Sequence, residues 1–190
     1  MSKTLIQNYR KIANEIPNNV TLVAVSKTKP IAVIETLYKE GQRIFGENRV
    51  EELVKKNKAL PSDIMWHMIG HLQSKKVKKI ASFISLIHSI DSLKLLTEVN
   101  KEAAKNNRII DCLLQFHIAQ EDSKYGFSQD EGLTVLKLVQ NKDMKNVRVV
   151  GVMGMASFSE DQNLIKNEFK RLVEISNLTK VILPSATEIS

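Results

Sequence analysis

Cysteine, glycine, proline and aromatic residues are all scarce in this chain of 190 residues. It holds one cysteine, seven glycines and four prolines, and 5% of its residues are aromatic. A single cysteine, Cys112, excludes an internal disulfide and any zinc site of the C-x-x-C kind. Because Cys112 lies in the apolar run IIDCLLQF, we expect a buried thiol without a redox role.

Long hydrophobic runs are also missing. No run approaches the roughly 20 apolar residues that a membrane-spanning helix needs. The first 19 residues are charged and follow a helical pattern, without the apolar core of a secretory signal. We therefore expect a cytoplasmic protein with no membrane partner.

Several signatures of catalysis are absent as well. The sequence contains no G-x-G-x-x-G, no G-x-x-x-x-G-K-[ST] and no G-x-S-x-G, which argues against a nucleotide fingerprint and a serine hydrolase. The four histidines, at positions 67, 71, 88 and 117, are scattered, so we expect no metal site.

Basic residues exceed acidic ones. The formal charge is +7 and the pI is about 9.4, which favours anionic partners. Lysines concentrate at 55–58 and 74–79, inside segments that read as helices, and are interpreted as solvated helix faces. No aromatic residue lies among these lysines, so a nucleic-acid partner is not expected.

The rest of the sequence alternates short apolar runs with helical patterns, which is typical of repeated βα units. Strands are predicted near 21–26, 43–46, 64–69, 84–90, 109–118 and 147–155. Helices are predicted near 2–16, 31–40, 49–59, 72–82, 92–106, 130–141 and 162–178. No linker divides them, so residues 1–190 are expected to form a single domain.

This pattern fits either an open sheet or most of an eight-unit barrel. The final residues, TEIS, begin like a seventh strand and stop. A (β/α)8 barrel typically takes about 250 residues. From the pattern alone, the fold is an open sheet or an incomplete barrel.

Polar residues gather where the predicted strands end, which is where α/β folds place their chemistry. They are Lys27, Glu47, Asn48, His67, Asp91, His117 and Lys124. With metal and serine chemistry set aside, amine chemistry remains. A lysine partly desolvated at the end of the first strand is neutral often enough to condense with an aldehyde.

Six segments, in this order and spacing, resemble one family. They are LVAVSKTKP, GQRIFGENRVEEL, WHMIGHLQSKK, IHSIDS, QEDSKYGF and GVMGM. They are similar to the pyridoxal phosphate homeostasis proteins, the YggS/PROSC type. The resemblance implies an α/β fold, the (β/α)8 TIM-barrel type of the alanine racemase N-terminal domain. Compared with that type, we expect the barrel to be truncated after the sixth βα unit, with strands seven and eight largely missing.

The resemblance also implies a function. Such a protein holds pyridoxal 5'-phosphate (PLP) as a Schiff base on Lys27, without a catalysed reaction of its own, and PLP-dependent apoenzymes are its possible recipients. The alternative is a PLP-dependent, racemase-like enzyme, for which Tyr125 is the one tyrosine in a strand-end loop. The cofactor-binding residues that the resemblance implies are Lys27, Asn48, His67, Gly70, Lys124, Met153 and Ser190.

Three departures from the family pattern affect these expectations. His117 and Lys75 each replace an asparagine of the family, which alters local hydrogen bonding. The family's S-M-G-M-S and R-I-G segments carry its phosphate contacts, and only Ser190 matches the first serine. The chain is therefore expected to be a fragment of a longer protein or one that completes itself by association.

Overall fold

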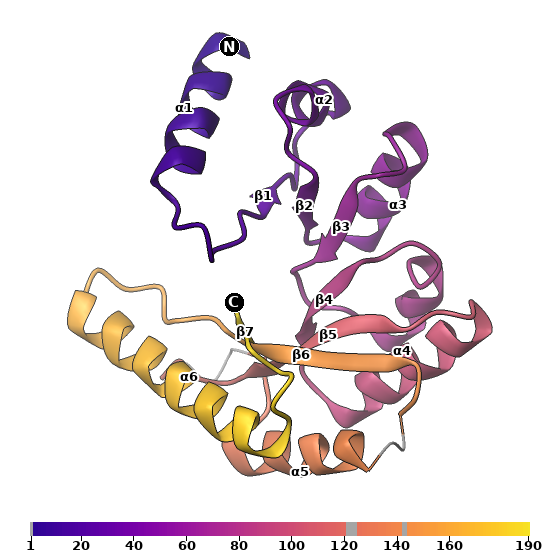
Figure 1. Ribbon diagram of the computed structural model, residues 1–190, viewed down its shortest axis with the longest axis vertical. Coiled ribbons are helices and arrows are strands. Elements are labelled where there is room, and N and C mark those ends of the chain that lie inside the picture. Colours follow the sequence, from indigo (N-terminus) through magenta and orange to yellow (C-terminus); the bar gives the residue numbers. More distant parts are fainter. Residues whose placement is uncertain (1, 121–124, 142–143) are drawn as a thin grey trace.

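The computed structural model describes residues 2–120, 125–141 and 144–190. Seven strands alternate with helices along the chain (Figure 1). The strands are β1 (Ala24–Val25), β2 (Ile44–Glu47), β3 (Met65–Met68), β4 (Leu86–Ile90), β5 (Ile110–Phe116), β6 (Val147–Gly154) and β7 (Glu188–Ile189). The helices are α1 (Ser2–Glu15), α2 (Ile31–Lys39), α3 (Val50–Ala59), the 3-10 helix η1 (Ser74–Lys79), α4 (Leu93–Lys105), α5 (Gln129–Gln140) and α6 (Gln162–Ile182).

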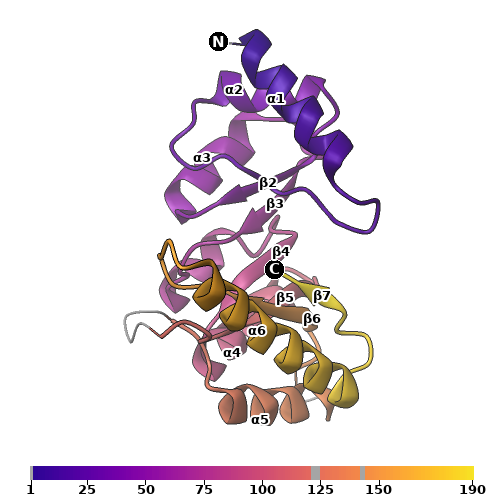
Figure 2. The ribbon, with the colours of Figure 1, turned by 90° about the vertical axis from the view of Figure 1, so that its left-hand side faces the viewer.

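All seven strands are parallel, and each pairs with the next along the chain, in the order β1 to β7. The sheet curls through part of a barrel, with the helices on its outer side (Figures 1 and 2). Large side chains of the outer face, such as Phe45 and Trp66, are fully buried beneath the helices. This confirms the predicted α/β barrel type.

The helix starts follow local sequence signals. Ser92 caps α4 by accepting the Leu95 N–H, and Ser128 forms a capping box with Glu131 at the start of α5. In α3, acidic residues occupy the first turn and lysines the last, which suits the helix dipole. The two serine caps mark where the chain turns into α4 after β4 and into α5 after β5.

One predicted helix differs in kind. Residues 72–82 were expected to form an α-helix, but the structure has the six-residue 3-10 helix η1 at this place. Val77 and Ile80 are both fully buried and lie three residues apart, which matches the period of a 3-10 turn. The predicted seventh strand at TEIS is present as β7.

The barrel is open on one side. Within the described residues, β7 pairs only with β6 and β1 only with β2, so no strand joins the two. Val25 on β1 is 52% exposed and Ile189 on β7 is 45% exposed. In the described part of the chain, no helix combines the length and apolar character required to cross a bilayer.

Candidate functional site

The carboxyl ends of β1, β2 and β3 bring three of the predicted residues to one mouth of the barrel. Lys27 follows β1, Asn48 directly follows β2, and Gly70 follows β3. A Cβ at Gly70 would lie 2.6 Å from the Asn48 carbonyl oxygen and 2.7 Å from its Cα. The two chain segments therefore touch, and only glycine allows this approach.

Lys27 is exposed in the structure. Its ammonium has no hydrogen bond or ion pair with another described residue. The expected desolvation of Lys27 is therefore wrong for this structure. The reason is the position of β1, which spans two residues and borders the open side of the barrel. No strand among the described residues lies on the far side of β1 to shield the lysine that follows it.

Asn48 carries an unsatisfied acceptor. Its side chain is half-buried, and its Oδ1 atom is fully buried without a hydrogen-bond partner among the described residues. A buried acceptor left unpaired costs free energy, on the order of 1 to 3 kcal/mol. A bound molecule can satisfy this acceptor only where the segment moves to expose it.

His67 lies deeper in the barrel, in a chain of three side chains. Its Nδ1 lies 3.0 Å from Nε2 of His88, and Nδ1 of His88 lies 2.9 Å from the Ser190 hydroxyl. Burial lowers the pKa of both histidines from 6.5 to about 4. Both imidazoles are therefore neutral near pH 7. His88 was not among the predicted site residues.

Met153 and Ser190 lie on neighbouring strands. The backbone N–H of Gly154 donates to the Ser190 carbonyl at 3.1 Å. A Cβ at Gly154 would lie 2.7 Å from Ile118 and 3.1 Å from Leu172 of α6, on the outer side of the sheet. Alternation along β6 therefore turns the buried Met153 toward the barrel interior. Lys124, the remaining predicted site residue, lies outside the described residues.

Two expectations about charged residues are wrong. Glu47 does not face the mouth: it is completely buried on the outer side of β2 and pairs with Lys56 of α3 at 2.6 Å. Lys56, expected on a solvated helix face, is 5% exposed. Lys56 also pairs with Glu52 at 3.2 Å, but this i,i+4 spacing is typical of exposed helix faces and does not signal burial.

Other polar groups lie near the ends of β3 to β5. His71 Nδ1 lies 3.0 Å from Asp91 Oδ2, and its ring stacks on Tyr125 with centroids 4.1 Å apart. The Ser89 hydroxyl donates to the Gly70 carbonyl at 2.6 Å. At the end of β5, the backbone N–H of His117 donates to the Phe127 carbonyl. These contacts tie the β3 end to its neighbours and form an aromatic, partly acidic rim.

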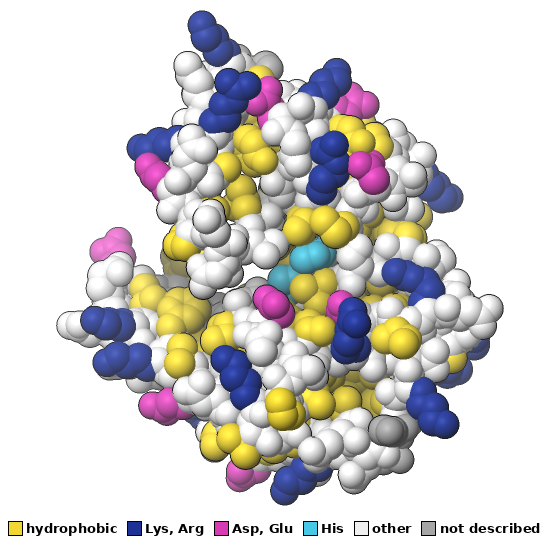
Figure 3. Space-filling model, viewed as in Figure 1, with side chains coloured by type: hydrophobic (Ala, Val, Ile, Leu, Met, Phe, Trp, Pro, Cys, Tyr) yellow, Lys and Arg dark blue, Asp and Glu magenta, His cyan; other side chains and the backbone are white. Residues whose placement is uncertain are grey.

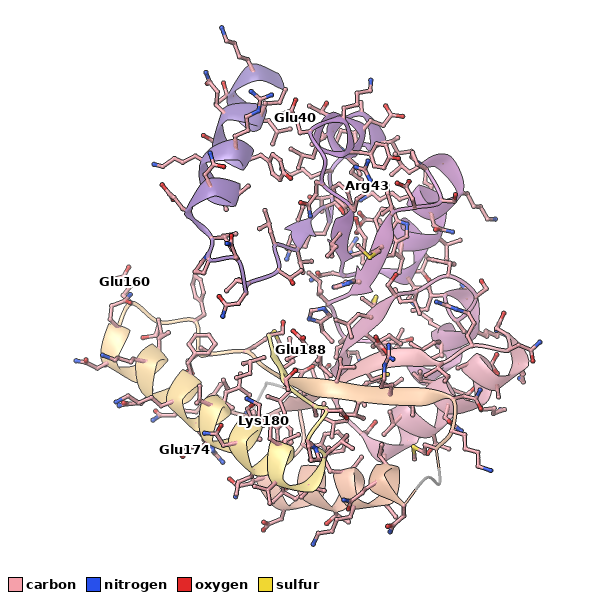
Figure 4. The ribbon with its side chains drawn as sticks, in the orientation of Figure 1. Glu40, Arg43, Glu160, Glu174, Lys180 and Glu188 are labelled. Carbon is pink, nitrogen blue, oxygen red and sulfur yellow. The ribbon has the colours of Figure 1, made fainter. Side chains whose placement is uncertain are left out.

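A cavity of about 350 Å³ occupies the barrel interior below the mouth. His67, His88, Asp111, Glu188 and Ser190 supply its polar lining. Figure 3 shows histidine side chains in a hollow at the centre of one face, and Figure 4 labels Glu188 on β7. Lys27, Asn48 and Gly70 do not line this cavity, so it is not the space beside the lysine.

The described residues hold no group of three or more His, Cys, Asp or Glu side chains suited to a metal ion. The chemical groups that the mouth offers are instead an exposed primary amine, an unpaired amide oxygen and, deeper in the barrel, neutral imidazoles. They suit the binding of an organic carbonyl compound rather than a cation.

The fold and the lysine after its first strand define an α/β barrel of the alanine racemase type. The family model of the alanine racemase N-terminal domain matches residues 2–186. The solved structure of PipY from Synechococcus elongatus, with PLP bound, superposes with a TM-score of 0.86 at 28% identity, over 97% of this chain and 87% of that chain.

Curated relatives give the narrower grouping. The pyridoxal phosphate homeostasis protein of Haemophilus influenzae is 33% identical over 95% of this chain and 76% of its own length. That of Synechocystis is 35% identical over 96% of this chain and 84% of its own length. The chain belongs to the pyridoxal phosphate homeostasis protein family.

Proposed function

We propose that this chain, as a single domain spanning residues 1–190, binds PLP at the barrel mouth as a Schiff base on Lys27. The observation that carries the proposal is the position of Lys27. Its exposed amine follows β1, the strand next to those that bring Asn48 and Gly70 together. Family membership and the PLP bound to PipY support the choice of ligand.

The residues present fit the aldehyde and ring of PLP. PLP supplies an aldehyde carbon that a primary amine can attack. Asn48 Oδ1, buried and unpaired in the described part, would accept a hydrogen bond from a ring donor once a movement of the segment exposes it. Gly70 keeps the neighbouring segment close without a side chain in the way. Of the phosphate contacts implied by the family, the described chain keeps Ser190, whose hydroxyl lies beside His88 in the interior cavity and not in the space beside Lys27.

The role that we propose is storage and delivery of PLP, without a catalysed reaction. The curated relatives are named pyridoxal phosphate homeostasis proteins, which supports this role. Attachment through a solvent-exposed lysine suits a carrier, because the linkage stays open to water and to incoming amines. PLP-dependent apoenzymes are the recipients that this role requires. His67 lines the interior cavity and Met153 is buried on β6, and we propose both as further contacts, with Lys124 as a secondary one.

The test is to replace Lys27 and measure covalent attachment. In Lys27→Ala, we expect the absorbance change on adding PLP to disappear, together with the mass increase at residue 27 after borohydride reduction. Lys29→Ala is the matched control, because Lys29 is an exposed lysine two residues away. Loss of attachment in the control, or retention in Lys27→Ala, would contradict the assignment of Lys27.

A racemase-like enzyme is the second candidate, and one observation favours it. Tyr125 stacks on His71, which pairs with Asp91, so a potential acid–base group lies at the rim. If this group acts on a PLP-bound amino acid, D/L interconversion of alanine with saturating PLP will exceed that of free PLP. Turnover equal to free PLP favours the carrier.

A further inference from the structure

Side chains from β2 and α3 hold the backbone immediately before Lys27. Ser26 is buried, and its hydroxyl donates to Glu47 Oε1 at 2.6 Å. The Lys56 ammonium donates to the Ser26 carbonyl at 2.8 Å and to the same Glu47 oxygen at 2.6 Å. A buried ion pair thus binds both the main chain and the side chain of the residue before the lysine.

A second contact holds the backbone immediately after Lys27. The Thr28 N–H donates to Glu52 Oε2 at 2.9 Å, and the Lys56 ammonium lies 3.2 Å from the same oxygen. Thr28 has φ of 63°, a left-handed conformation that β-branched residues rarely adopt. Such a conformation persists only where the surroundings enforce it, and it is often found at functional sites.

From these contacts we infer that Glu47, Glu52 and Lys56 are positioning residues for the attachment of PLP to Lys27. This inference rests on the proposed function. When the Lys27 amine joins the aldehyde carbon, a C=N bond forms and water leaves, so the nitrogen must approach that carbon along a defined line. The Lys27 side chain has no partner of its own in the described chain, so its fixed backbone determines where the amine begins.

Two adjacent glutamates of α3 provide a matched comparison. Glu51 and Glu52 both pair with lysines, but only Glu52 accepts the Thr28 N–H. We expect Glu52→Ala to slow PLP attachment at residue 27 about tenfold, while Glu51→Ala leaves the rate unchanged. The rate is measured by borohydride trapping and mass spectrometry, with the thermal midpoint recorded for each variant.

Other variants separate positioning from stability. Glu52→Gln keeps an acceptor oxygen for Thr28, so it should restore most of the rate. The double variant Glu47→Gln with Lys56→Met removes both buried charges together and should also slow attachment. It avoids the unpaired buried charge that either single change would leave.

The outcomes distinguish this inference from the proposed function. If wild type gains mass at residue 27 and Glu52→Ala does so at the same rate, the positioning role is wrong and Lys27 stands. A slower rate that tracks only the fall in thermal midpoint, without rescue by Glu52→Gln, also overturns it. If wild type gains no mass at residue 27, the proposed function and this inference fail together.

Discussion

His67 and His88 share one hydrogen bond inside the barrel, and only one of the two facing nitrogens can carry the proton. Protonating both rings would place two positive charges side by side in a buried cavity. Burial lowers the pKa of each histidine to about 4, below the value of 6.5 for a histidine exposed to water. The unfolded chain therefore binds more protons than the folded chain between these two values.

The free energy of unfolding should consequently fall as the pH drops from 6.5 to about 4. The expected loss is about 3 kcal/mol for each of the two histidines. Well above pH 6.5, these residues should no longer make the free energy of unfolding depend on pH. Urea unfolding at a series of pH values measures the effect.

The control separates this pair from the other titrating groups. His71→Gln should keep the slope, because His71 is exposed and not part of the pair. A variant with His67→Asn and His88→Gln should flatten it. An unchanged slope in that variant would show that other groups, such as carboxylates, cause the loss.

Individual side chains show where sequence reasoning stops. Lys27 and Asn48 could be assigned to one mouth, because parallel strand ends meet at one edge, whereas Gly70 was implied by the family resemblance. The sequence could not predict that Lys27 is exposed and that Lys56 is buried. The burial of Lys56 depends on Glu47 and Ser26, which approach it only after the helix docks on the sheet.

Among the strands, β7 depends on one glycine. A Cβ at Gly151 would lie 1.9 Å from the Glu188 carbonyl oxygen, and backbone atoms cannot yield as a flexible side chain can. Gly151→Ala should therefore displace β7 from β6, at a cost of about 1 to 3 kcal/mol. Displacement also removes the Ser190 N–H bond to the Val152 carbonyl.

Amide hydrogen exchange at Ser190 reports this displacement directly, and we expect faster exchange in Gly151→Ala. Gly41→Ala is the comparison. Its added Cβ meets no atom within 4 Å, although its φ of +100° makes alanine strained. That variant should lose some stability without changing exchange at Ser190. Equal exchange in both variants would mean that β7 tolerates the methyl group.

At this scale the sequence predicts most elements correctly, because buried parallel strands read as apolar runs between helical patterns. The exception, residues 72–82, shows the limit. Lysines around Val77 suggest an amphipathic α-helix, yet the structure has a 3-10 helix, in which Val77 and Ile80, three residues apart, are both buried. An apolar spacing of three residues between charged ones fits either kind of helix, so the pattern alone does not distinguish them.

For the whole molecule, the open side of the barrel has an apolar border. Phe169 and Val173, one turn apart on α6, are 44% and 47% exposed. Figure 3 shows hydrophobic side chains grouped over α6. Contiguous exposed apolar surface favours association. We therefore expect wild type to self-associate as its concentration rises, as measured by light scattering.

The double variant Phe169→Gln with Val173→Gln should scatter less than wild type at equal concentration. Leu93→Gln serves as control, since Leu93 is an exposed apolar residue at the start of α4, away from this border. Should the double variant and the control scatter alike, the α6 face is not the region that associates.

The sequence indicated the class of fold but left an open sheet and an incomplete barrel as alternatives. Curvature decides between them, and it arises from the twist of all strands together rather than from any local pattern. The predicted seventh strand is present and pairs with β6. The absence of a side chain at Gly151 allows this close approach, which the sequence alone does not reveal.

The strict succession of the strands has a consequence for biosynthesis. Every strand from β2 onward lies beside the one that precedes it in the chain. A ribosome releases the chain from its amino terminus, so each newly emerged strand meets a neighbour that has already left the exit tunnel. Within the described residues, the sheet can thus be laid down progressively during translation, with each strand after β1 meeting a neighbour that has already emerged.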